Sequence, residues 1–205
     1  MTKTDTQVKN REFTEKRILD AVGEIITECG FEKVGINAVA QRADVSKMLI
    51  YRYFGSIDEL IMQYIIKYDY WINIPINAIP EINNLGDFLK DMFRKQIYQL
   101  REDVALRRLC RWELSTDNPV TTNLREQREK SGSRMVEMMS KLTTAPQDEV
   151  AALASVLSAS ISYLAMLEEL CPVYNGISIQ TDAGWEQIAK GIDTIIDLWI
   201  NSKKQ

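Results

Sequence analysis

Apolar residues recur at every third or fourth position along most of the chain, and this spacing is typical of helices. In the first predicted helix, residues 14–29, the side chains of Ile18, Val22 and Ile25 share one face with Cys29. No run of alternating apolar and polar residues is sustained, so strands are not expected. The same spacing predicts further helices at residues 36–43, 47–54, 56–71, 87–101, 104–115, 119–141, 146–170 and 181–201. The expected fold class is therefore all-α.

Two short predicted helices, 36–43 and 47–54, are joined by a three-residue turn. Asp44 stands in that turn where a left-handed backbone is needed, and Asp tolerates this conformation. Ser46 is a natural N-cap for the second helix, and Ala40 is small where the two helices cross. The pattern predicts a helix-turn-helix, whose second helix enters the DNA major groove.

A set of residues in and around this hairpin follows an ordered pattern: Arg17-Ile18-Leu19, Gly30-Phe31, Val39-Ala40, Val45-Ser46-Lys47, Ile50-Tyr51, Phe54, Ser56 and Leu60. This pattern resembles the TetR/AcrR family of bacterial transcriptional repressors. The resemblance implies a three-helix DNA-binding head at residues 11–71. It also implies a helical body at residues 72–205 that binds a ligand and dimerises.

The resemblance also indicates which side chains contact DNA. Lys47 is expected to read guanine or hold a phosphate, and Met48 to touch a thymine methyl group. Thr14 and Lys16, near the predicted start of the first helix, are candidates to hold a phosphate. The full set of candidate DNA-binding residues is Thr14, Lys16, Asn37, Ser46, Lys47, Met48, Tyr51, Arg52 and Tyr53. The alternative for each is an ordinary solvated helix face.

Several features weaken the expected DNA contact. Leu49 and Ile57 stand where the family usually has Thr and Lys, which commonly touch phosphates. The first 60 residues carry nine basic and ten acidic side chains, and the whole chain has a net charge of −4. Overall charge therefore does not attract DNA, and any DNA binding must depend on a small basic surface. An alternative function is therefore a helical small-molecule-binding or adaptor protein whose head no longer binds DNA.

An aromatic and methionine-rich set of side chains lies on the predicted helices of the body. Methionine adapts to varied apolar ligands, and Tyr and Trp add a polar group, so these side chains suit a small-molecule effector. The candidate ligand-binding residues are Trp71, Met92, Phe93, Gln96, Trp112, Met138, Tyr163 and Met166. The alternative is plain core packing, and the sequence does not disclose which effector binds.

The last two long helices are the expected dimer interface. A stripe of small residues (Ala151, Ser155, and Ser158 or Ala159) and an apolar stripe (Trp185, Ile188, Ile192, Ile195 and Trp199) would form a four-helix bundle across a two-fold axis. A homodimer implies a palindromic, double-stranded DNA operator. The alternative is that both stripes cover the chain's own core.

Residue types that are absent exclude many common enzyme mechanisms and leave only a carboxylate or cysteine mechanism open to an all-helical enzyme. The chain has no histidine, which excludes a Ser-His-Asp triad and a His-containing zinc site. No Cys-x-x-Cys motif provides paired metal ligands. We therefore expect no catalytic activity and no cofactor.

Three cysteines, far apart in sequence, favour reduced and buried thiols in a cytoplasmic protein. Val150–Leu167 is uncharged over eighteen residues, at the lower limit for a membrane span. Acidic residues flank it on both sides, and its many serines and alanines lower its hydropathy. We expect a helix inside a bundle or dimer and no membrane contact.

Overall fold

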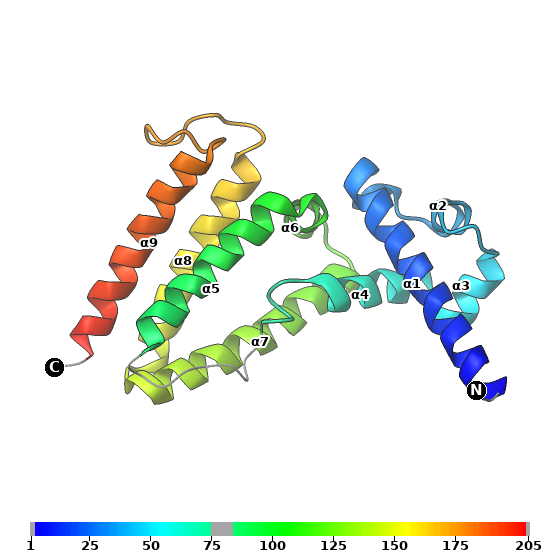
Figure 1. Cartoon of the computed structure of the whole chain (residues 1–205), viewed down its shortest axis with the longest axis horizontal. Helices are drawn as coiled ribbons and strands as arrows, with labels where there is room; N and C mark the ends of the chain where they lie inside the picture. Colours follow the sequence, from blue (N-terminus) through cyan, green and yellow to red (C-terminus); the bar gives the residue numbers. More distant parts are fainter. Residues whose placement is uncertain (1–2, 75–83, 204–205) are drawn as a thin grey trace. The chain divides into compact units, whose positions relative to one another are not determined.

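Figure 1 presents the computed structural model of the chain, which describes residues 3–74 and 84–203. Within these residues the chain forms nine α-helices, one short 3-10 helix and no strand, so the all-α prediction is confirmed. The elements are α1 (Lys3–Cys29), η1 (Phe31–Lys33), α2 (Ile36–Arg42), α3 (Lys47–Phe54), α4 (Ile57–Tyr68), α5 (Leu85–Glu102), α6 (Val104–Ser115), α7 (Pro119–Thr143), α8 (Gln147–Leu167) and α9 (Asp182–Ser202).

The chain divides into two compact units. The head unit comprises Met1–Asp69 and Arg111–Arg125, and the body unit comprises Tyr70–Cys110 and Glu126–Gln205. Helices α6 and α7 each contribute residues to both units. The sequence places the first boundary at residue 71, two residues later, and does not assign residues 111–125 to the head. The functions assigned to the two parts stay predictions.

The core of the head unit is built on α1, which packs against η1, α2 and α4. Gly30 ends α1 with a φ of 90°, and its amide donates to the carbonyl oxygen of Ile26 at 3.0 Å, which confirms the predicted C-cap. The ring of Phe31 in η1 then stacks on that of Trp112 in α6, with centroids 4.7 Å apart and planes 12° from parallel. Because both rings are buried, this stack joins residues 111–125 to the remainder of the head.

The body unit is organised around α5, which packs against both α8 and α9 (Figure 1). Cations on α5 face acids on α9. Lys90 Nζ lies 2.5 Å from an Asp197 oxygen, while Arg94 pairs with Asp193 at 2.6 Å and with Glu186 at 2.9 Å. Each partly exposed pair adds little stability, but together they select the register of α5 on α9.

A buried arginine closes the carboxyl end of α5. Arg107 donates to the carbonyl oxygens of Leu100 and Arg101, and its Nε lies 3.0 Å from a Glu169 carboxylate oxygen beyond α8. The last carbonyls of a helix have no partner within the helix, so Arg107 satisfies two of them. A charge this deeply buried requires such partners, and the arginine therefore links α5, α6 and the end of α8.

Several helix boundaries and burial expectations were wrong. α1 begins at Lys3 rather than residue 14, and α4 ends at Tyr68, so Trp71 lies beyond it. Cys110 is buried as expected, but Cys29 is exposed and Cys171 is half-buried. Cys29 is the last residue of α1, at the end of the face that carries Ile18 and Val22.

Among the described residues, α8 is the one helix that is long and apolar enough to cross a membrane, and the core helix of a soluble protein can pass the same test. Only 22% of its apolar window is buried. The exposed large apolar side chains of α8 and α9 include Val156, Tyr163, Ile195 and Leu198. Much of the apolar surface of these two helices is therefore not covered by the chain itself.

The predicted interface stripe of α9 needs correction. Trp185 and Ile192 are 2% and 6% exposed and pack in the core of the body unit, where Trp185 Nε1 donates to the carbonyl oxygen of Ile179. Ile195 lies on the exposed side, together with Leu198, which is not part of the predicted stripe. The stripe therefore divides between the core and the surface.

Candidate nucleic-acid interface

The second helix of the predicted helix-turn-helix, α3, is closed at both ends by local interactions. Ser46 Oγ accepts a hydrogen bond from the Leu49 amide at 3.2 Å, which confirms the predicted N-cap. Gly55 ends α3 with a φ of 82°, and its amide donates to the Tyr51 carbonyl oxygen at 2.9 Å. Asp44 adopts a φ of 49°, the left-handed conformation expected in the turn.

The two faces of α3 differ as the sequence predicts. Ile50 and Phe54 are buried and hold the helix on the head core. On the opposite face Met48 is 80% exposed and Tyr51 is 49% exposed, and both Lys47 and Arg52 are exposed as well. This face presents a cation, a thioether and a phenol to solvent, which are groups that contact phosphates and base edges in the major groove.

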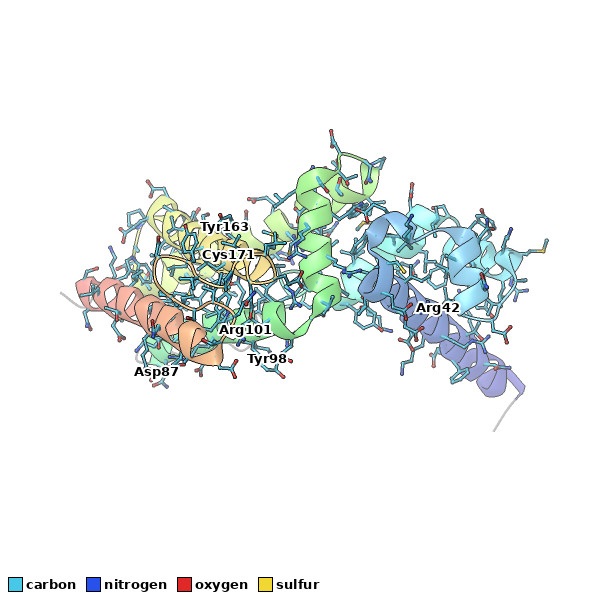
Figure 2. The ribbon with its side chains drawn as sticks, turned by 90° about the horizontal axis from the view of Figure 1, so that it is seen from above. Arg42, Asp87, Tyr98, Arg101, Tyr163 and Cys171 are labelled. Carbon is cyan, nitrogen blue, oxygen red and sulfur yellow. The ribbon has the colours of Figure 1, made fainter. Side chains whose placement is uncertain are left out.

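The acidic face of α1 is tied to the other helix of the hairpin. Arg42, labelled in Figure 2, donates to Glu28 at 2.6 Å and 2.9 Å and to Glu24 at 3.1 Å. The hydrogen bond from Arg42 holds the pKa of Glu28 below its usual range, and the same bond raises the pKa of Arg42. The Arg42 guanidinium is thus occupied by two carboxylates of α1, and it neutralises part of the charge of Glu24 and Glu28.

The candidates outside α3 have different surroundings. Asn37 is exposed on the first turn of α2, and Lys16 is exposed on α1. Because α1 begins at Lys3, Thr14 does not lie at a helix N-terminus, so the argument from a helix terminus is wrong. Thr14 Oγ1 donates to the carbonyl oxygen of Asn10 at 2.8 Å. DNA contact by these residues stays a prediction.

Tyr53 is half-buried, and the structure assigns it partners that the sequence did not reveal. The Cζ atoms of Arg11 on α1 and Arg52 on α3 lie 5.2 and 5.3 Å from the centroid of the Tyr53 ring. Arg11 lies 42 positions before Tyr53 and outside the pattern of the family, so only the packing of α1 on the hairpin brings the two together. The only sequence signal was the basic character of Arg11.

The head unit contains a segment whose sequence is similar to known proteins. Residues 18–64 match the model of the family described as bacterial regulatory proteins, tetR family. The resemblance to this family is therefore confirmed for residues 18–64. A stretch of 47 residues is 49% identical to the HTH-type transcriptional repressor KstR of Mycolicibacterium smegmatis, and this match covers 23% of the length of each protein.

Two solved structures resemble the chain over most of its length. SCO7518 of Streptomyces coelicolor A3(2), assigned as a transcriptional regulator, aligns with a TM-score of 0.54 and 19% identity over 86% of this chain and 96% of its own. A mutant of HlyIIR aligns with a TM-score of 0.53 and 19% identity over 80% of this chain and 93% of its own. At this identity the likeness shows the fold alone, which is all-α in the described residues.

Some of the predicted ligand-binding residues meet in the body unit. Gln96, only 3% exposed, donates to Ser158 Oγ at 3.0 Å and to Ser162 Oγ at 3.4 Å. Trp71 Nε1 also donates to Ser158 Oγ, at 3.4 Å, and the Arg128 guanidinium lies 4.4 Å from the Trp71 ring centroid. A polar group is therefore buried among α5, α8 and the segment after α4.

The remaining predicted ligand residues are distributed more widely. Phe93 is buried, whereas Met92, Met138 and Met166 are half-buried. Tyr163 is 52% exposed and meets Tyr174 edge to face, beside the loop that carries Cys171 (Figure 2). Trp112 belongs to the head unit, where its ring stacks on that of Phe31, whereas Gln96 belongs to the body unit.

Proposed function

We propose that this chain is a homodimeric transcriptional repressor that binds a palindromic operator and is released from it by a small-molecule effector. It acts in the cytoplasm and catalyses no reaction. The observation that carries the proposal is α3: an eight-residue helix, capped at both ends, whose outer face exposes Lys47, Met48 and Tyr51. These groups suit base edges and phosphates, and the buried Ile50 and Phe54 fix the helix that presents them.

Dimerisation is supported by the exposed apolar side chains of α8 and α9. Val156 is 66% exposed and Leu198 is 68% exposed, and α8 is uncharged over most of its length. Monomeric soluble proteins seldom leave such surfaces uncovered. A second copy of the chain, related by a two-fold axis, would cover both helices and present two α3 helices to two operator half-sites.

The effector is expected in the body unit, near the polar group formed by Trp71, Gln96 and Ser158. Buried polar side chains among aromatic and methionine residues supply both apolar contact and orientation for a small molecule. An effector that prefers a body conformation incompatible with operator spacing would release the DNA through that difference in affinity.

Selection of duplexes from a random pool by the purified protein tests the proposal. We expect enrichment of a palindrome. By fluorescence anisotropy, Lys47→Ala should then weaken binding to all duplexes and reduce the salt slope by about 1 for each protomer, or about 2 for the dimer. Met48→Ala should weaken binding mainly at one base position, whereas Lys67→Ala on α4 should change little.

The alternative function is a helical small-molecule-binding or adaptor protein that has lost DNA binding. Leu49 and Ile57 favour it, since these half-buried apolar side chains replace the usual phosphate contacts. Recovery of no sequence, and binding that Lys47→Ala does not alter, would support this alternative and overturn the repressor.

A further inference from the structure

Two arginines from different helices share one aromatic ring in the head unit. Arg11 of α1 and Arg52 of α3 both lie over the ring of Tyr53, with Cζ atoms 5.2 and 5.3 Å from its centroid. A guanidinium that rests on a ring keeps its N–H edge available for a second, anionic partner. Tyr53 therefore gathers two cationic hydrogen-bond donors next to the exposed side chains of α3.

The carboxylate that the structure places on this cluster is that of Glu15. Arg11 Nε lies 2.7 Å from Glu15 Oε1, one helical turn along α1. Two arginines and one glutamate leave these three side chains with a net positive charge. The side chains of Arg11 and Glu15 are 59% and 31% exposed, and an ion pair with this exposure is weak and readily exchanged.

We propose that Arg11, held on Tyr53, is an additional contact to the DNA backbone, and that Glu15 occupies its guanidinium when DNA is absent. A phosphodiester offers the same kind of anionic oxygen acceptor as the Glu15 carboxylate, and arginine binds both through paired N–H groups. This inference rests on the proposed DNA-binding function and adds a residue of α1 to the interface.

The position of Arg11 favours the backbone over the bases as its partner. Arg11 belongs to α1, whereas the side chains that suit base edges lie on α3. Contacts to phosphates set the register of a protein on the duplex and carry no sequence information directly. Arg11 therefore partly replaces the phosphate contacts that Leu49 and Ile57 cannot make.

Anisotropy titrations at several salt concentrations test the contact on two labelled duplexes. One duplex is the sequence selected by the wild-type protein, and the other has the same length and composition in scrambled order. Arg11→Gln should lower affinity roughly threefold or more on both duplexes. It should also reduce the salt slope by about 1.8, because a dimer loses one phosphate contact in each protomer. Glu15→Gln should raise affinity on both, because it removes the competing carboxylate.

The role of the ring is tested by a double substitution. If Tyr53 positions Arg11, Arg11→Gln should cost less affinity in a Tyr53→Leu protein than in the wild type. Lys67→Gln is the matched control, since it removes a cation that lies 5.2 Å from the Tyr68 ring centroid on α4. This control should leave affinity and salt slope unchanged, and thermal melts should show that every variant is folded.

The outcomes separate this inference from the proposed function. If the selected duplex binds tightly and Arg11→Gln behaves like Lys67→Gln, the Arg11 contact is refuted and the repressor proposal stands. If no sequence is enriched but Arg11→Gln still flattens the salt dependence on the scrambled duplex, the contact is supported and the sequence-specific repressor is refuted.

Discussion

Truncation of Leu198 on α9 is the most informative perturbation of the proposed dimer. The side chain is 68% exposed in the single chain, so Leu198→Ala should barely change the fold of a protomer. In a dimer built on α8 and α9, the same side chain becomes buried in the interface. Because the axis is two-fold, each substitution acts twice.

The expected loss follows from the exposed area. Full burial of a leucine side chain is worth about 1.5–3 kcal/mol, so covering the exposed two thirds is worth about 1–2 kcal/mol. Two copies per dimer give about 2–4 kcal/mol, which corresponds to a roughly 30- to 1,000-fold weaker dimer. Leu114→Ala is the matched control, since Leu114 is 76% exposed on α6 in the head unit.

Sedimentation equilibrium over a wide range of protein concentration measures the dissociation constant of each variant. We expect Leu198→Ala to shift the monomer–dimer transition to higher concentration and Leu114→Ala to leave it in place. The role of α9 in the dimer interface would be refuted by a wild-type protein that stays monomeric at every concentration. It would also be refuted if the Leu198→Ala protein dimerised as tightly as the Leu114→Ala control.

Three further predictions concern single side chains. Asp44→Gly should stabilise the protein by about 0.5–1 kcal/mol in thermal melts, because φ at this position is 49° and glycine adopts it without strain; a lower melting temperature would contradict this. Trp112→Ala should cost about 3–5 kcal/mol in urea unfolding, because the buried indole stacks on Phe31, and a loss below about 1 kcal/mol would show that the stack is dispensable. Burial raises the pKa of Tyr70 to about 12, so an absorbance titration should show one late phenol that Tyr70→Phe removes. The folded state retains this proton longer than the unfolded state, so stability should be unaffected below about pH 10 and fall between about pH 10 and 12, and a titration without the late phenol would refute the shift.

The parts of the head that sequence predicted well are those fixed by local chemistry. Ser46 accepts from an amide three residues ahead, and Gly55 and Asp44 adopt backbone angles that their own residue types favour. Such interactions act within one turn of chain, so the sequence carries them in full. The ends of α3 were therefore predicted to the residue.

Features that depend on packing between distant segments were not predictable in the same way. Trp185 and Leu198 are both apolar and lie on one helix, yet the first is 2% exposed and the second 68%. Periodicity identifies an apolar stripe but does not say which part of it meets the chain's own core. Similarly, nothing near Trp112 in the sequence indicates that it stacks on Phe31, 81 positions earlier.

The division of α6 and α7 between the two units limits how this protein can be recombined. A fragment that ends at residue 71 would omit residues 111–125 and leave the Phe31 ring without Trp112. The head unit of this chain therefore cannot be joined to another body at a single junction, because the chain passes between the two units three times. Under the proposed function, point substitutions on the outer face of α3 should change DNA-binding specificity and leave the three connections between the units intact.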